Sequence, residues 1–329
     1  MDTGIPTASS IGKPETLRNR IVDWVILDGS RHVVAAGIVA LVVGFFTALV
    51  WADVVAVGVG SSVDRAFGSG LTAGVVTLVT IALSINQLIL SRVFGSPGQL
   101  RDRLDGARTL RTRVMKIAGE PSSPNDPAAF LSLLARTIDD RATATRRAVE
   151  RGSQDSPEEL TGSLSDIAEY GRSIDEHVEE GTPIVDVLSI IVGSEYATNM
   201  TAVQHLHNVH EESLPAEANA QFEALSGLFE SLAVVRQFFK TLAVQQDFAM
   251  LSRLLVYTGL LGLLASLALT LVYSTDAVAI DPSLLPVIVP IAFGIAITPL
   301  AVFSAYVLRA ATVAYRTVSV GPFVPPDER

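Results

Sequence analysis

The sequence predicts an all-α protein that crosses a membrane several times, and three observations lead to this fold class. Hydrophobic residues make up 49% of the 329 residues, and the mean hydropathy is +0.42. A soluble protein rarely averages so apolar, so part of the chain is expected in lipid. The apolar residues are concentrated in long runs, and the remaining sequence has helical periodicity with no persistent strand pattern.

Each apolar run is long enough for one transmembrane helix. A helix needs about 20 apolar residues to cross roughly 30 Å of hydrocarbon. The runs carry only Asp53 and Arg92 as charges, and they cover residues 33–59, 71–93, 254–273 and 284–308. We therefore predict a polytopic protein with two pairs of transmembrane helices: about 33–53 and 71–93 in a first hairpin (32–94), and about 254–273 and 285–308 in a second hairpin (251–309).

The distribution of basic residues predicts the orientation, because Lys and Arg collect on cytoplasmic flanks. The N-terminal arm (1–31) and the segment that follows the second run are rich in Arg, and the C-terminal tail (310–329) is preceded by Arg309. The loop near 60–69 has only Arg65, and the loop at 274–283 has no basic residue. We expect a multi-pass protein of the cell membrane with both termini in the cytoplasm.

The N-terminal arm contains a short amphipathic segment at residues 15–28. Leu17, Ile21, Trp24 and Val25 fall on one face of a helix. Such a helix is suited to lie on the inner membrane surface. A small helix packed on the cytoplasmic domain fits the same pattern, and the sequence leaves both alternatives open.

The central region, 95–250, reads as a cytoplasmic helical domain. Asp126 and Pro127 are typical of a helix start, and Ser156 with Glu159 forms a capping box. The helix that follows is expected to end at Gly181. Its apolar residues have 4-3-4-3-4 spacing, which favours a coiled-coil-like seam for helix packing; they are Leu160, Leu164, Ile167, Gly171, Ile174 and Val178. A further helix is expected over about 184–210.

The last helix of this region is predicted to run without a break into the third apolar run. It begins after Pro215 and contains no Pro and a single Gly, Gly227, before that run. Continuous to Tyr273, it has about 59 residues and a length of roughly 88 Å at 1.5 Å per residue. Such a helix would couple the cytoplasmic domain to the membrane.

A stripe of polar side chains runs along the second apolar run. It has spacings of 3, 4, 3 and 4 residues and consists of Thr77, Thr80, Ser84, Gln87 and Ser91. Small and hydroxyl residues let helices approach closely and hydrogen-bond across the contact. The same stripe could line a water-filled path, with Arg92 at its inner mouth attracting anions or extending to the interface. Both interpretations stay open.

The fourth run contains two prolines, Pro290 and Pro299, inside its helical pattern. Each removes a backbone hydrogen bond and kinks a helix. They are either static kinks for packing or a gating hinge.

The remaining motifs give no catalytic assignment. The histidines of "QHLHNVHEE", which are His205, His207 and His210, could ligate a metal or sense pH, but surface histidines explain them as well. The chain has no Cys, which excludes thiol catalysis and Cys-ligated metals. We expect no enzymatic activity, no cofactor and no bound metal, and no nucleic-acid motif is visible.

The order of two spans, a helical region and two further spans resembles the layout of bestrophin-type channels and of flagellar stator-type proteins. The resemblance is one of layout, and the intramembrane carboxylate of the stator type has no counterpart here. Proton- and sodium-coupled transport usually needs such a carboxylate, so coupled transport is disfavoured. The acidic, Lys-poor composition, with a net charge of −10, is halophile-like, although GC-rich codon usage gives the same bias.

Two functional hypotheses follow. The first is an oligomeric channel or small-solute pore, lined by the stripe and gated through the cytoplasmic helical domain. Four helices enclose little space, so this hypothesis requires a homo-oligomer in the lipid bilayer. The alternative is a membrane-anchored sensor or scaffold whose cytoplasmic domain binds a protein partner.

Overall fold

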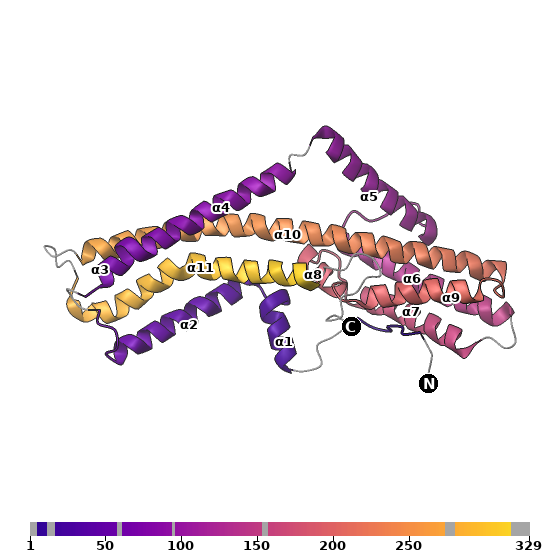
Figure 1. The fold of residues 1–329 in the computed structure, drawn as a ribbon, viewed down its shortest axis with the longest axis horizontal. Coiled ribbons are helices and arrows are strands. Elements are labelled where there is room, and N and C mark those ends of the chain that lie inside the picture. The colour runs from indigo at the N-terminus through magenta and orange to yellow at the C-terminus, as the bar shows by residue number, and fades with distance from the viewer. Residues whose placement is uncertain are drawn as a thin grey trace. The chain divides into compact units, whose positions relative to one another are not determined.

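The computed structural model describes residues 5–11, 17–57, 61–93, 96–152, 157–273 and 280–316, without the side chains of residues 19, 28, 64, 89–93 and 316. Every regular element within these residues is a helix, so the all-α prediction is confirmed (Figure 1). The elements are α1 (Leu17–Asp23), η1 (Trp24–Asp28), α2 (Arg31–Trp51), α3 (Val63–Arg65), η2 (Ala66–Leu71), α4 (Thr72–Val93), α5 (Pro97–Ala118), α6 (Pro127–Gly152), α7 (Glu158–Glu176), α8 (Ile184–Ile190), α9 (Glu195–His210), α10 (Ala216–Val272), η3 (Pro282–Leu284) and α11 (Leu285–Arg316).

Four of these elements are long and apolar enough to cross a membrane, as predicted. The candidate spans are Arg31–Trp51, Ala66–Leu88, the apolar part of Ala216–Val272, and Pro282–Tyr315. The helix of the last span, α11, continues beyond the predicted end at residue 308 to Arg316, because the residues "AATVAY" contain no helix breaker. The predicted unbroken helix is α10, a single helix of 57 residues.

The chain divides into two compact units. Unit 1 comprises Met1–Arg20, Gly95–Ala243 and Val313–Arg329, and unit 2 comprises Ile21–Phe94 and Val244–Thr312. Unit 2 holds the apolar parts of the candidate spans, and unit 1 holds most of the polar helices. Helix α10 contributes its first part to unit 1 and its last part to unit 2.

Within unit 2, α10 lies between α4 and α11, and α2 packs on the other side of α11 (Figure 1). Small residues make these contacts close: a Cβ at Gly259 would lie 2.6 Å from Val79 of α4, and one at Gly262 would lie 3.4 Å from the Cα of Ala296 in α11. Close approach of this kind is typical of helix packing in membranes. Helices α2 and α4 are thus the less buried ones, with 17% of their span residues buried against 50% for the span that contains α11.

Two apolar cores hold unit 2 together, one at each end of the bundle. One core contains Val34 and Ala35 of α2, Ala82 of α4, Leu251 and Leu255 of α10, and Ala301, Val302, Ala305 and Tyr306 of α11. The other contains Val50, Val57, Val63, Phe67, Leu269, Leu285, Val289, Ala292 and Ala296. Each core draws residues from both ends of the chain, so the four helices fold as one bundle.

Helix α2 ends where the first charge of its apolar run occurs. Asp53 has a φ of 55°, in the left-handed region. The amide of Val54 donates to the carbonyl of Leu49 at 3.0 Å, and the amide of Asp53 donates to the carbonyl of Val50 at 3.2 Å. This is the Schellman pattern, in which Asp tolerates a conformation usually taken by Gly. The C-terminal end of α2, the first candidate span, is therefore fixed by local backbone bonds.

In unit 1, α6 and α7 pack closely through the predicted seam of α7. Leu160, Leu164, Ile167 and Ile174 are buried, and a Cβ at Gly171 would lie 2.7 Å from the carbonyl oxygen of Ala135 in α6. The seam is thus covered by the chain itself. Helix α7 ends at Glu176 rather than at Gly181, and Val178 lies beyond it. Ser156 of the predicted capping box lies outside the described residues.

The segment at 184–210 forms two helices rather than one, which corrects the prediction. The break lies between α8 and α9, at Ile191 and Val192. The fully buried guanidinium of Arg236 in α10 donates to both carbonyls, to that of Ile191 at 2.9 Å, and lies 4.8 Å from the ring centre of Tyr196. A buried cation therefore satisfies the carbonyls that the helix end leaves free.

The environment around Arg236 also changes the pKa of Tyr170. Burial raises the pKa of Tyr170 far above its usual value, and the negative charge of Glu195 adds to this effect while the Arg236 charge opposes it. Tyr170 thus stays neutral at any physiological pH and packs against Phe229 with a ring separation of 6.5 Å. Within unit 1, the Arg236 guanidinium thus joins the end of α8 to α10 and lies against Tyr196 of α9.

The close contact at Gly171 predicts a specific effect of adding one methyl group. Gly171→Ala should destabilise the protein by about 1–3 kcal/mol, because backbone atoms of α6 must move apart. Gly162→Ala is the matched control on the same helix, where a Cβ meets nothing within 4 Å, and it should be neutral or stabilising by up to about 1 kcal/mol. Thermal unfolding of the purified full chain, followed by circular dichroism, measures both. Equal effects would contradict the packing described.

Candidate functional site

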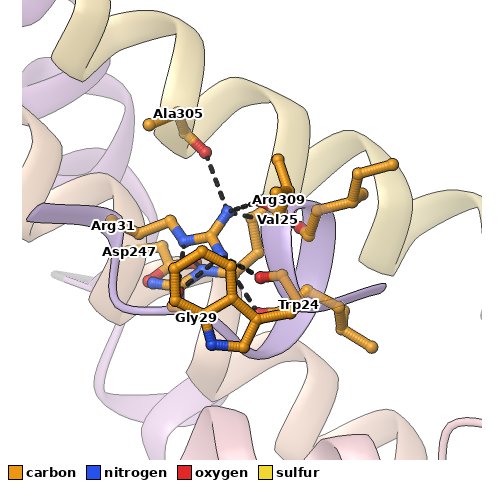
Figure 2. A network of polar contacts seen from close by, with 9 residues as sticks. Trp24, Val25, Gly29, Arg31, Asp247, Ala305 and Arg309 are labelled. Atoms are coloured by element: carbon orange, nitrogen blue, oxygen red, sulfur yellow. Dashed lines mark hydrogen bonds and ion pairs between the residues drawn. The ribbon is translucent and has the colours of Figure 1, made fainter. Parts of the chain in front are cut away.

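A cluster of charged side chains is buried at one end of the unit 2 bundle. Arg31, at the start of α2, is 2% exposed. Asp247 of α10 and Arg309 of α11 lie beside it, with side chains that are 9% and 11% exposed (Figure 2). Charged side chains are almost never this buried unless they are paired or hydrogen-bonded. We call these three residues the charged cluster.

The guanidinium of Arg31 binds the end of the preceding helical segment. It donates to the carbonyls of Val25 at 3.0 Å and Gly29 at 2.9 Å, and more weakly to those of Trp24, Ile26 and Leu27. The last turn of a helix has carbonyls without intrahelical partners and carries the negative end of the helix dipole. A cation placed there is doubly favourable, so Arg31 caps η1.

The same guanidinium also reaches α11. Its Nη1 donates to the carbonyl of Ala305 at 3.3 Å (Figure 2). Gly29 allows the tight turn between η1 and α2, because a Cβ there would lie 2.5 Å from the carbonyl oxygen of Trp24. The two residues between η1 and α2, Gly29 and Ser30, therefore reverse the chain so that the Arg31 side chain faces η1.

Asp247 and Arg309 form a buried bidentate ion pair between α10 and α11. Nε of Arg309 donates to Oδ2 of Asp247 at 2.7 Å, and Nη2 donates to Oδ1. The Arg309 guanidinium also lies 5.6 Å from the ring centre of Tyr306. Planar two-point recognition of this kind fixes both side chains. The charged cluster thus ties η1, α2, α10 and α11 together at one end.

The polar stripe lies on the outward side of α4. Thr77, Thr80, Ser84 and Gln87 are all exposed, whereas Val75 and Ala82 on the opposite side are buried. The hydroxyls of Thr77, Thr80 and Ser84 donate to the carbonyls four residues earlier at 2.8–3.0 Å. Within the described residues, the Gln87 amide has no hydrogen-bond partner. The side chains of Ser91 and Arg92 lie outside the described residues.

The two prolines lie inside α11, and the helix continues through both. The third and fourth residues before the second of them, Ala296 and Ile295, face Gly262 of α10 with their backbone atoms. Pro290 and Pro299 are buried. The structure therefore places them in the helix-packing interior of unit 2, and the hinge interpretation stays a prediction.

The three histidines lie on α9 in unit 1 without forming a cluster of ligands. His205 is exposed, and the ring of His207 stacks on Phe222 with ring centres 5.3 Å apart. His207 keeps a buried Nε2 without a partner. Among the described residues, no group of three His, Cys, Asp or Glu side chains is arranged to hold a metal ion.

Sequence reasoning missed the charged cluster because it counted Arg31 and Arg309 as flanking charges. A signal was present in the chain. Asp247 stands close before the third apolar run, and Arg309 stands directly after the fourth. Opposite charges at matching ends of antiparallel helices are candidates for an ion pair, but a single sequence does not reveal that they are buried.

The buried pair predicts a strongly non-additive mutational effect. Asp247→Asn or Arg309→Gln alone should cost about 3–5 kcal/mol, because each leaves a buried polar partner uncompensated. The apolar double variant Asp247→Leu, Arg309→Met should cost clearly less than the sum of the two. Arg253→Gln, which changes an exposed arginine of α10, is the control and should be nearly neutral. Denaturant unfolding of the purified chain measures all four, and additive single effects would overturn the assignment.

Comparison with known proteins gives a family but no activity. No curated protein and no solved structure matches the chain. One family model matches residues 7–329, which include all four candidate spans. The chain therefore belongs to the Family of unknown function (DUF7972).

Proposed function

We propose that the protein is a homo-oligomeric channel or small-solute pore of the cell membrane, lined by the stripe of α4 and gated through unit 1. The observation that carries this proposal is the direction of the stripe. Thr77, Thr80 and Ser84 face away from the chain's own bundle at the depth of the apolar core. Polar side chains at that depth are expected to face protein or water rather than lipid.

A second copy of the chain is the natural cover for this face. The four helices of one chain pack around apolar cores, and the stripe plays no part in that packing. In a closed ring of copies, α4 of each copy would face the axis. Gln87, whose amide has no hydrogen-bond partner among the described residues, would lie near the inner end of the path, and Arg92 would follow it.

The proposed topology has unit 2 in the membrane and unit 1 in the cytoplasm. What supports it is the excess of Lys and Arg on the unit 1 side of the spans, with a single basic residue, Arg65, in the two hairpin loops. Segment 17–28 would lie on the inner membrane surface, since Ile21 and Trp24 are 63% and 44% exposed. The spans would then form two hairpins with the helical domain between them.

Ion flux into liposomes is the direct test of the pore. Ser84→Leu, Gln87→Leu should abolish the flux of the wild type, because it replaces the polar lining with apolar side chains that exclude water. Ala36→Leu, Ala40→Leu adds the same residues to the exposed face of α2 and should leave flux unchanged. If wild-type protein with native circular dichroism gives no flux, the pore proposal fails.

Thiol labelling tests wetness and orientation together, because the chain contains no Cys. A membrane-impermeant maleimide added outside cells should label Ser69→Cys, an exposed position of η2 near the start of the second candidate span. It should also label Ser84→Cys through the pore. Ala40→Cys on the exposed side of α2 should stay unlabelled, since it faces lipid.

The labelling pattern separates the alternatives. Labelling at Ser69→Cys but not at Ser84→Cys, together with cross-linking of Ser84→Cys between copies by oxidation, would make the stripe a dry contact between subunits. No labelling at Ser69→Cys in intact cells, with labelling after lysis, would reverse the proposed orientation.

A second candidate function is a membrane-anchored sensor. The observation that favours it is an apolar pocket of about 440 Å³ within unit 1, lined by residues of α5, α6 and α10. The seam of α7, which suggested a protein partner, is covered by α6. A small ligand is therefore better supported than a protein partner, and a pull-down with the full chain that recovers a stoichiometric protein would contradict this preference.

A further inference from the structure

The pocket of unit 1 has the size and lining of a small-molecule site. Its volume of about 440 Å³ falls within the range of about 300–1,000 Å³ that is typical of ligand pockets. Its walls come from Ala107 and Leu110 of α5, Phe130 of α6, and Val234 and Phe238 of α10. All of these residues belong to unit 1.

The walls are apolar but incompletely covered. Val234 is 54% exposed and Phe238 is 49% exposed, although both line the pocket. Large apolar side chains that stay this exposed on neighbouring turns of a helix favour a bound apolar group. Phe130, which is 7% exposed, forms the buried floor beside them. The lining therefore fits a hydrocarbon chain.

The charges of the pocket are of one sign. Of the described residues that line the pocket, Arg103 and Arg111 are the only ionisable ones, and no acidic side chain is among them. Arg111 is half-buried, and its Nε and Nη2 donate to Ser123, to the carbonyl of Pro124 and to Asn125 at 2.7–3.0 Å. All of these acceptors are neutral, and within the described residues no carboxylate forms an ion pair with Arg111. The guanidinium is thus held rigid with its charge available.

We propose that this pocket binds a long-chain aliphatic carboxylate. The hydrocarbon chain lies against Phe130, Val234 and Phe238, and the carboxylate lies at the Arg111 guanidinium. A fixed guanidinium beside an apolar wall recognises one anionic head and one apolar tail, whereas a nucleotide or sugar would need many more polar partners. The inference rests on residues of unit 1 alone and is independent of whether α4 lines a pore.

Photolabelling of the full chain in phosphatidylcholine nanodiscs tests the proposal. The probe is a free long-chain carboxylate with a diazirine near the end of its chain, and the matched probe is its methyl ester. Mass spectrometry of the digested protein locates the adducts. We expect the carboxylate, at low concentration, to label peptides that contain Leu110 or Phe238. The half-labelling concentration of the ester should be about tenfold higher than that of the carboxylate, as expected from the loss of one charge-assisted hydrogen bond.

Three variants sharpen the test. Ala107→Trp fills the pocket and should remove the label from these peptides, while background labelling of the apolar spans persists as an internal standard. Arg111→Gln should raise the half-labelling concentration of the carboxylate about tenfold and leave that of the ester unchanged. Arg108→Gln on the same helix, whose side chain pairs with Asp105 outside the pocket, should behave as wild type.

Clear outcomes overturn the proposal. Labels confined to peptides of the spans would mean that the probe only partitions into lipid. Equal half-labelling by carboxylate and ester in the wild type would remove the role of the charge without relying on any variant. Pocket labelling that survives Ala107→Trp, in protein with native circular dichroism, would place the adduct elsewhere. None of these results depends on flux, so they are separable from failure of the pore.

Discussion

The hydrogen bonds of the buried Arg31 guanidinium determine how the chain enters the unit 2 bundle. A cation at 2% exposure is tolerable because carbonyls at a helix end surround it. Those carbonyls are themselves unsatisfied without a donor. The guanidinium and the carbonyls therefore offset each other's cost of burial. The position of α2 against η1 and Ala305 follows from this need for hydrogen-bond partners, in addition to apolar packing.

In unit 1, a second buried arginine binds the free carbonyls at the end of another helix. Arg236 is 1% exposed and donates to the carbonyls of Ile191 and Val192, where α8 ends. In both units a planar guanidinium serves several carbonyls at once. A lysine ammonium is a compact point charge with three donors and could not span the same set. The Arg-rich, Lys-poor composition thus has a structural consequence, since buried arginines fix helix ends in both units.

The sequence reveals features that depend on local pattern and hides those that depend on partners. Helix α10 and the four candidate spans follow from apolar length and the absence of breakers, so they were predictable. The break at Ile191 was not, because it depends on Arg236, which lies 45 residues away. The burial of Arg31 was hidden for the same reason. A charge next to an apolar run looks like a membrane flank until its acceptors are known.

The residues of the polar stripe on α4 were predictable from the sequence, but the direction in which they face was not. Periodicity placed Thr77, Thr80 and Ser84 on one face of a helix, yet it could not say which face α10 would cover. Val75 and Ala82 take that role: Val75 lies next to Gly259 of α10, and the carbonyl of Ala82 accepts a hydrogen bond from Ser252 of α10 at 3.1 Å. A single sequence does not show which helix packs against α4, so it cannot predict which face of α4 is covered.

The back-bonding of the stripe explains how an outward polar face could persist before assembly. The proton of each hydroxyl is already used in a hydrogen bond to the carbonyl four residues earlier. Exposing such a hydroxyl to hydrocarbon therefore costs less free energy than exposing one without a partner. Thr77, Thr80 and Ser84 can therefore face lipid in a single inserted chain. Their oxygen atoms still accept hydrogen bonds from water or from a neighbouring helix. Within the part of the chain that the structure describes, the Gln87 amide has no such partner, so it is the group that gains most from the proposed assembly.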